Sequence, residues 1–341
     1  MSEVNEKTPL LEVRNLRKLF AGKSSFFQKD KSWIKAVDDV SFTLNPKETL
    51  GVVGESGCGK STMGRSVLRL IEPTSGEIFY KGKDFTKASG QELRKMRADM
   101  QIIFQDPFSS LDPRMTVSQL IAEPLKYHPI LKAKNKKELE KETEETVLEL
   151  MRTVGLAERL YNAYPHELDG GRRQRIGIAR ALALQPKLIV CDEPVSALDV
   201  SIQAQILNLL QDLQKERGLT YIFITHNLSV VNHIADEIAV MYLGSVVEKA
   251  PVEELFENPL HPYTKALLSV IPIPEIHEVK KELAIQGEVV SPINLPDECR
   301  FYKRCPVRCD ACRQGVPALR EVSPGHFVAC AKCQQAPAGQ C

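Results

Sequence analysis

The stretch Gly54-Glu55-Ser56-Gly57-Cys58-Gly59-Lys60-Ser61 decides the fold of this 341-residue chain. It matches the pattern G-x-x-x-x-G-K-[ST], and it lies between the apolar run TLGVVG at 49–54 and the helical spacing of MGRSVLRLI at 63–71. Glycines let the backbone N–H groups of such a loop surround phosphate oxygens, and the N-terminus of the next helix adds a favourable dipole. The sequence therefore predicts a strand, a phosphate-binding loop and a helix, in this order.

Residue types within this loop assign roles toward a nucleoside triphosphate. Lys60 is placed to reach the β and γ phosphates, Ser61 offers its hydroxyl to Mg²⁺, and Thr62 can bond the α-phosphate. The candidate nucleotide-binding residues of the loop are Gly54, Glu55, Ser56, Gly57, Cys58, Gly59, Lys60, Ser61 and Thr62.

Two further apolar runs, LIVCDE at 188–193 and YIFITH at 221–226, are typical of parallel strands, and the helical stretch QAQILNLLQDLQKERG separates them. Parallel strands joined by helices place ligands at their carboxyl ends. We therefore expect Asp192 to hold Mg²⁺ and Glu193 to orient or deprotonate the attacking water. Since an Asp-Glu pair after an apolar run is also typical of a surface loop, this assignment depends on its pairing with the phosphate loop. Alternating strands at 10–44 complete a chain of the α/β class.

Charge and hydropathy exclude several classes of protein. Lys and Arg total 45 against 44 Asp and Glu, a net charge of +1, which does not favour nucleic acid as a partner. The chain has no run of about 18 apolar residues, and its N-terminus lacks the apolar core of a signal peptide. We expect a protein that is neither secreted nor membrane-spanning.

Cysteines gather at the carboxyl end: seven of the nine lie between Cys299 and Cys341, after a Pro-rich stretch that suggests a boundary near residue 260. Without a secretion signal, metal or iron-sulfur ligation is favoured over disulfides. The other two, Cys58 and Cys191, are interpreted as small packing residues.

Four more motifs occur in a characteristic order with the loop and Asp192-Glu193: IIFQDP at 102–107, LDGGRRQRIGIARAL at 168–182, SALD at 196–199 and ITH at 224–226. With all six, residues 10 to about 250 resemble an ATP-binding cassette (ABC) subunit. The resemblance implies ATP and Mg²⁺ as cofactors, a RecA-like P-loop NTPase core with an antiparallel β subdomain, and an inserted helical subdomain. It also implies that Gln105 senses Mg²⁺ and the attacking water, and that His226 contacts the γ-phosphate.

The expected division of the chain follows from that resemblance. The core with its β subdomain would occupy residues 1–105 and 181–260, the helical subdomain residues 106–180, and a Cys-rich extension residues 261–341. Phe20 is expected to stack on adenine, with Trp33 as the alternative.

The signature motif departs from the family's usual L-S-G-G-Q, since this chain reads Leu168, Asp169, Gly170, Gly171 and Arg172. Asp169 remains a good helix N-cap. In this family the signature faces the nucleotide of a partner subunit, where a carboxylate would repel the γ-phosphate unless Arg172 or Arg173 compensates. We therefore expect a heterodimer with a second homologous ATPase and two unequal sites.

The tail, HPYTKALLSVIP at 261–272 followed by C-R-F-x-x-R-C-P, is similar to that of oligopeptide and dipeptide importer ATPases. This implies a peripheral subunit at the cytoplasmic face of the membrane, which works with two transmembrane permease subunits and, indirectly, an extracytoplasmic peptide-binding protein. The match is closest to the dipeptide branch, but nickel and glutathione importers share the tail, so the substrate stays open.

Cys299, Cys305, Cys312 and Cys330 follow the spacing C-x5-C-x6-C-x17-C, which in this branch implies a 4Fe-4S cluster. Four cysteines equally suit tetrahedral Zn²⁺, and free or disulfide-bonded thiols are the third reading.

Two other functions compete with the importer. One is a soluble cassette ATPase that acts on nucleic acid or ribosomes, and the other is a metal or redox sensor regulated by ATP. The single cassette, the neutral charge and the importer-like tail favour a transporter subunit over both.

Overall fold

The computed structural model describes residues 8–22, 32–128, 135–270 and 292–334, which excludes Cys341. The chain forms two compact units. Unit 1 takes Met1–Leu44, Thr49–Thr86 and Phe223–Cys341, and unit 2 takes Asn45–Glu48 and Lys87–Ile222.

Unit 1 holds the phosphate loop, one complete sheet and several strands of a second sheet. Its strands are β1 (Leu11–Ala21), β2 (Trp33–Leu44), β3 (Thr49–Val53), β4 (Ser75–Tyr80), β5 (Lys83–Asp84), β9 (Glu237–Tyr242), β10 (Ser245–Pro251), β11 (Arg320–Ser323) and β12 (His326–Val328). Its helices are α1 (Lys60–Val67), α7 (Leu228–Ile234), α8 (Val252–Glu257), α9 (Pro262–Ser269) and the short 3₁₀ turns η3 (Tyr302–Arg304) and η4 (Asp310–Arg313).

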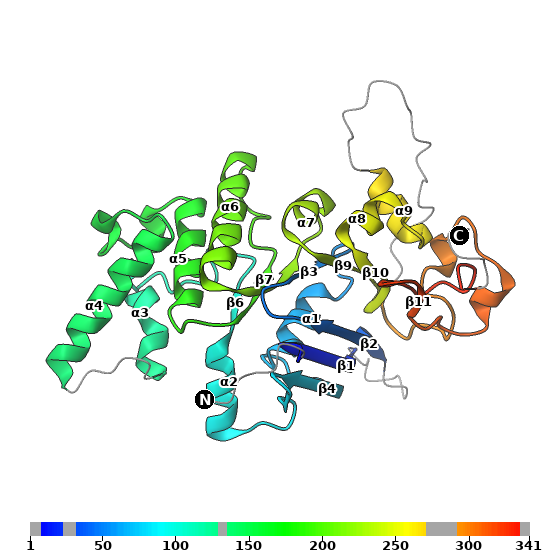
Figure 1. The fold of residues 1–341 in the computed structure, drawn as a ribbon, viewed down its shortest axis with the longest axis horizontal. Helices are drawn as coiled ribbons and strands as arrows, with labels where there is room; N and C mark the ends of the chain where they lie inside the picture. Colours follow the sequence, from blue (N-terminus) through cyan, green and yellow to red (C-terminus); the bar gives the residue numbers. More distant parts are fainter. Residues whose placement is uncertain (1–7, 23–31, 129–134, 271–291, 335–341) are drawn as a thin grey trace. The chain divides into compact units, whose positions relative to one another are not determined.

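One sheet of unit 1 is antiparallel, with strand order β2-β1-β4-β5, and it appears in blue in Figure 1. From Asp39 to Leu44, β2 alternates between exposed and buried residues, because one face of the strand covers the core. The antiparallel β subdomain that the sequence predicted is thus present.

The other sheet places β3 beside β9 in parallel, and β9, β10, β12 and β11 continue it as antiparallel neighbours. β3 is buried at every residue, as expected of a central strand with both faces covered. β11 and β12 come from the cysteine-containing tail, so the tail contributes two strands to the sheet that begins the phosphate loop.

The tail also shares the hydrophobic core of unit 1. Cys299, Phe301 and Cys312 are buried in one cluster with Val53 of β3 and Tyr263 of α9. The rest of unit 1 therefore supplies apolar packing for the described part of the tail.

Unit 2 consists mostly of helices. They are α2 (Gly90–Asp99), α3 (Val117–Tyr127), α4 (Lys136–Thr153), α5 (Gly170–Leu182), α6 (Val200–Arg217) and the 3₁₀ turns η1 (Glu158–Leu160) and η2 (Pro165–Glu167). The strands β6 (Met100–Ile103) and β7 (Leu188–Asp192) pair in parallel, and β8 (Thr220–Ile224) begins in unit 2 and ends in unit 1.

Local sequence accounts for the starts of α3 and α4 in unit 2. α3 begins with a capping box between Thr116 and Gln119, and the side chain of Asn135 caps α4 by accepting from the Glu138 N–H at 2.9 Å. α3, α4 and α5 pack against one another (Figure 1). None of the helices in the described part of the chain is long and apolar enough to cross a membrane.

The predicted fold class is confirmed: the strands, the phosphate loop and the helices occur where the sequence placed them. The division into residues 1–105 with 181–260, 106–180 and 261–341 stays a prediction.

Candidate functional site

The phosphate loop keeps a backbone that only glycine tolerates at two of its positions. Gly54 has φ +152° and Gly59 has φ +108°, and Gly59 is the N-cap of α1. A Cβ at Gly54 would come within 2.2 Å of the Met241 carbonyl oxygen, and one at Gly59 within 2.0 Å of the Ala36 carbonyl oxygen. Unit 1 therefore holds the loop tightly against β9 and β2, and the spacing of glycines in the sequence reflects this close approach.

Lys60 is folded onto the loop that precedes it. Its Nζ donates to the carbonyl oxygens of Gly54 at 2.7 Å and Glu55 at 3.0 Å, and only 4% of the residue is exposed. The ammonium group is thus fixed at the centre of the loop, where it can also meet phosphate oxygens.

Ser61 and Thr62 lie in the first turn of α1, both half-buried. The free N–H groups of a first turn and the helix dipole favour a bound anion there. Cys58 packs beneath the loop as predicted, and burial raises the pKa of its thiol, although the Lys60 ammonium partly opposes this.

The two candidate adenine-stacking residues lie on neighbouring strands. Phe20 on β1 pairs with Ile34, one residue from Trp33 on β2, and both rings are exposed. Lys18 Nζ lies 5.0 Å from the Phe20 ring centre. The backbone of Trp33 exchanges two hydrogen bonds with Asn294 of the tail. Both residues keep a ring face open, so the choice between them stays a prediction.

His226 is exposed and follows the carboxyl end of β8. The residue before it, Thr225, is tied to the central strand because its N–H donates to the Val52 carbonyl at 3.1 Å. Asn227 then caps α7 through the Ser229 N–H. These bonds fix the turn that carries the imidazole.

Asp192, Glu193 and Gln105 belong to unit 2. Asp192 ends the buried strand β7, and Glu193 follows with φ +47°, a backbone conformation that costs a non-glycine residue energy. Ser196 stabilises the bend, since its N–H and hydroxyl both donate to the Glu193 carbonyl. The Gln105 side-chain amide donates to Glu193 Oε2 at 3.0 Å, so the structure brings together two of the three predicted catalytic residues.

The segment after Gln105 is bound to the signature helix α5. Arg180 donates to the Ser110 carbonyl at 2.7 Å, and the Arg173 guanidinium lies 3.8 Å from the centre of the exposed Phe108 ring. A movement of α5 would therefore act on the segment next to Gln105, as expected of a loop that links a catalytic residue to helices.

In the signature motif, the Asp169 carboxylate is paired with an arginine of the same helix. Asp169 caps α5 by accepting from the Arg172 N–H at 2.8 Å, and its other carboxylate oxygen lies 3.3 Å from the Arg172 guanidinium. Arg173 instead turns inward and donates to the Pro165 carbonyl. Arg172, not Arg173, is thus the residue that compensates the carboxylate, and both members of the pair are about half exposed.

The described cysteines of the tail lie near one another, but they are not arranged as a metal site. The Cys299 N–H donates to the Cys312 carbonyl at 2.8 Å, and the sulfur atoms of Cys309 and Cys312 are 3.6 Å apart. Burial, with a smaller contribution from neighbouring cysteines, raises the pKa of Cys299 to about 12. Among the described residues no three His, Cys, Asp or Glu side chains are grouped to hold a metal ion. A centre at Cys299, Cys305, Cys312 and Cys330 stays a prediction.

Two residues that the sequence reading left without a role touch the phosphate loop. Arg304 of η3 makes two hydrogen bonds to the Glu55 carboxylate, at 2.8 and 2.9 Å, and the Tyr263 hydroxyl accepts from the Glu55 N–H at 2.9 Å. Tyr263 lies in the tail motif HPYTKALLSVIP and Arg304 in C-R-F-x-x-R-C-P. The sequence shows both motifs, but it does not predict that they contact the phosphate loop.

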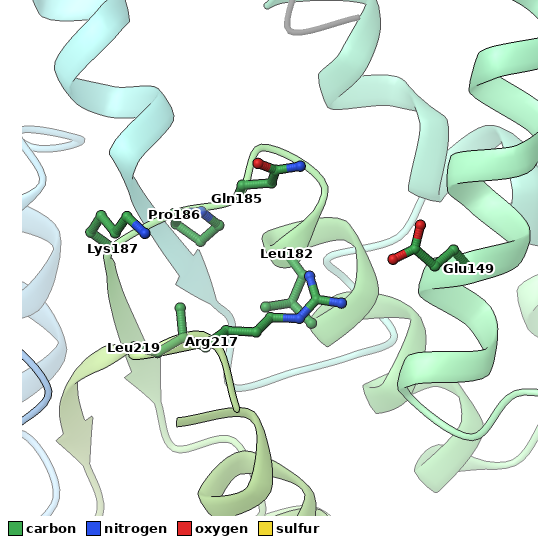
Figure 2. A pocket seen from close by; sticks show the side chains of 7 residues that line it. All are labelled: Glu149, Leu182, Gln185, Pro186, Lys187, Arg217 and Leu219. Carbon is green, nitrogen blue, oxygen red and sulfur yellow. The ribbon is translucent and has the colours of Figure 1, made fainter. Parts of the chain in front are cut away.

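A pocket of about 270 Å³ lies in unit 2, with the lining shown in Figure 2: Glu149, Leu182, Gln185, Pro186, Lys187, Arg217 and Leu219. Lys187 precedes β7, so the pocket lies at the amino end of that strand, whereas Asp192 lies at its carboxyl end. Parallel sheets bind ligands at the carboxyl ends, so this pocket is separate from the predicted nucleotide site.

Comparison with known families gives two matches on the chain. The family described as "ABC transporter" matches residues 37–196, and the one described as "Oligopeptide/dipeptide transporter, C-terminal region" matches residues 247–312. The second range includes both Tyr263 and Arg304.

Curated relatives match over nearly the whole length. The oligopeptide transport ATP-binding protein AppF of Bacillus subtilis is 50% identical and covers 97% of this chain and 99% of its own. The oligopeptide transport ATP-binding protein OppF of Salmonella typhimurium is 51% identical, and the match covers 96% of this chain and 98% of OppF. The dipeptide transport ATP-binding protein DppF of Haemophilus influenzae is 47% identical, and the match covers 96% of this chain and 98% of DppF.

Solved structures give the same fold. A dimeric post-hydrolysis state of the ATP-binding cassette MJ0796 bound to ADP and Pi has a TM-score of 0.62 at 29% identity, covering 71% of this chain and 98% of that one. cbiO1 of Clostridium perfringens, part of the transporter complex cbiONQ, has a TM-score of 0.60 at 27% identity, over 73% and 91%. The chain is therefore a member of the ATP-binding cassette family, an ATPase with the carboxyl-terminal region of oligopeptide and dipeptide transporters.

Proposed function

We propose that this chain is the ATP-hydrolysing subunit that powers an importer of dipeptides or oligopeptides across the cytoplasmic membrane. The observation that carries the proposal is that a cassette at 37–196 and a peptide-transporter carboxyl-terminal region at 247–312 lie on one chain. Relatives named for oligopeptide and dipeptide transport cover 96% or more of its length, which supports the same substrate class.

In the proposed chemistry the phosphate loop binds ATP through its backbone N–H groups and Lys60, and Ser61, Gln105 and Asp192 hold Mg²⁺. The metal ion would neutralise charge on the phosphates. Glu193 orients or deprotonates the attacking water, Gln105 steadies the Glu193 carboxylate through the 3.0 Å hydrogen bond, and His226 donates to the γ-phosphate. The strained backbone at Glu193 supports this assignment, because strain of that kind concentrates at functional residues.

The proposed assembly contains two membrane-spanning permease subunits, a second homologous ATPase and, indirectly, an extracytoplasmic peptide-binding protein, with this chain peripheral at the cytoplasmic face. Its described helices include none that could span a membrane, so the channel would come from other chains. Unequal partners are supported by the departure of the signature at Asp169 and Arg172, because a homodimer would place this departure at both nucleotide sites.

The finer proposal for the tail is a 4Fe-4S cluster held by Cys299, Cys305, Cys312 and Cys330, with Zn²⁺ as the alternative. Thiols are suitable ligands for both. Neighbouring cysteines contribute to the raised pKa values of Cys299, Cys305 and Cys312, as expected of thiols that lie close together. Among the described residues no three potential ligand side chains are grouped around one point, so the four cysteine side chains would have to turn toward a common centre to bind a metal.

Purification of the tagged chain from native membranes tests the function. We expect two polytopic membrane proteins and a second cassette protein to co-purify, with ATPase activity that peptide-loaded binding protein raises. Recovery of ribosomes or nucleic acid instead would support the soluble cassette ATPase. Recovery of no partner, together with ATP affinity that depends on redox state, would support the sensor.

A further inference from the structure

We propose that Arg304 is a positioning residue for ATP binding, which holds and neutralises Glu55 inside the phosphate loop. The inference deepens the proposed function, since it concerns the same nucleotide site. It rests on a bidentate contact between the cysteine-rich tail and the loop, both within unit 1.

Glu55 is the second residue of the loop, and three of its groups are occupied. Its N–H donates to the Tyr263 hydroxyl, its carbonyl accepts from Lys60 Nζ at 3.0 Å, and its carboxylate accepts two bonds from Arg304. Lys60 and Arg304 therefore act on the same residue from opposite sides. A shift of Glu55 would displace an acceptor of the lysine that meets the phosphates.

Charge gives a second reason for the contact. A free carboxylate in a loop that binds phosphates would repel them, and the paired guanidinium cancels that charge. The Arg304 side chain is 8% exposed and that of Glu55 is 23% exposed, so water screens the pair only weakly.

The surroundings of Arg304 hold it in place. The N–H of Arg304 donates to the Phe301 carbonyl at 3.0 Å, and the Phe301 ring lies edge-on to Tyr242 with centroids 5.3 Å apart. The neighbouring Arg300 donates to the Leu243 carbonyl and to Asp38. Gly244 in turn donates its N–H to the Cys58 carbonyl of the loop. The tail thus contacts the loop directly and also its supporting turn.

The test is ATP hydrolysis by the assembled transporter, with KM and kcat measured separately. For Arg304→Gln we expect KM for ATP to rise about tenfold, within the usual range of coupling between contacting sites, and kcat to stay within about twofold. The double variant Glu55→Gln with Arg304→Gln should recover most of the loss, because it removes the uncompensated carboxylate. Arg304→Lys keeps the charge but not the bidentate contact, so its KM for ATP should lie between those of the wild type and Arg304→Gln.

Arg308→Gln is the matched control, since Arg308 is an exposed arginine four residues further along the same segment. It should leave KM unchanged. A wild-type KM for ATP in Arg304→Gln would overturn the proposal. A double variant with the same raised KM as Arg304→Gln would also overturn it, because that result would indicate a loss of folding alone. A wild-type complex without ATPase activity would instead contradict the proposed function and not this inference.

Discussion

The phosphate loop at 54–62 and the cysteine segment at 299–312 lie in one unit, but they follow different rules. The loop has a fixed pattern because backbone geometry and phosphate chemistry dictate each residue. In the cysteine segment the spacing of the thiols does not determine their role, which depends on the ligand they bind and on the residues the segment packs against. Arg304 of the segment binds Glu55 of the loop, and Phe301 packs in one core cluster with Val53, the residue before the loop. The two regions therefore differ in how sequence encodes them and yet depend on each other.

The largest effect should follow a change at the proposed catalytic carboxylate. Glu193→Gln should leave ATP binding intact and lower turnover by about 10²–10⁴-fold, the usual contribution of a positioned general base. Single-turnover hydrolysis in the assembled complex measures this. Glu158→Gln, a change at an exposed residue of unit 2, is the control. A Glu193→Gln complex with wild-type turnover would remove Glu193 from its role.

Lys60→Ala should act on binding itself. It removes the ammonium that bridges Gly54 and Glu55 and meets the phosphates, so ATP affinity should fall about 10–100-fold, as expected for loss of charge-assisted hydrogen bonds. Equilibrium binding of a fluorescent ATP analogue reports it. Unchanged affinity would mean that ATP does not occupy this loop.

Cys305→Ser and Cys312→Ser test whether the thiols order the tail. If they hold a centre, residues 292–334 should become about tenfold more sensitive to protease, because cleavage follows the population of the opened segment. ATP should still bind, but with raised KM, since Arg304 lies beside Cys305. Iron, sulfide and zinc assays on anaerobic protein identify the centre. A segment that stays protected in metal-free protein would show that packing against unit 1 suffices.

The sequence could predict whatever depends on local rules. The loop, its flanking strand and helix, the carboxylates after β7 and the cap at Asp169 all follow from residue type at short range. The hydrogen bond from Gln105 to Glu193 and the contact of Arg304 with Glu55 join residues that are far apart in the chain. Only the packed fold brings such pairs together, and their residue types alone do not name their partners.

A smaller effect is expected at the signature. Asp169→Ser with Arg172→Gln restores the usual family residues and keeps a capping side chain, so α5 should persist. Because the Asp169–Arg172 pair is exposed and worth little, we expect turnover to change by less than about fivefold. ATPase assays with the partner's own site disabled isolate the affected nucleotide. Equal turnover at both sites before and after the change would argue against unequal sites.

The smallest effect concerns the attachment of β12. His326 is buried between Glu248 and Glu254, and although burial lowers its pKa, the hydrogen bonds to the two carboxylates raise it above the usual value. Its contribution to stability is therefore complete below about pH 6.5 and is lost as pH rises through the folded-state pKa. Thermal unfolding at pH 6.5 and pH 9 should show this loss, and His326→Gln should reduce it. A His326→Gln protein with the same pH dependence would contradict the assignment.

The central claim, that this chain converts ATP hydrolysis into peptide import, is tested most directly by phosphate release from the transporter reconstituted in lipid vesicles. Vesicles that contain the chain, its permeases, the second ATPase and the peptide-binding protein should release phosphate faster when dipeptides or oligopeptides are added, and labelled peptide should accumulate with it. The Glu193→Gln complex should do neither. Phosphate release that ignores peptide, or peptide uptake that continues in the Glu193→Gln complex, would contradict the claim.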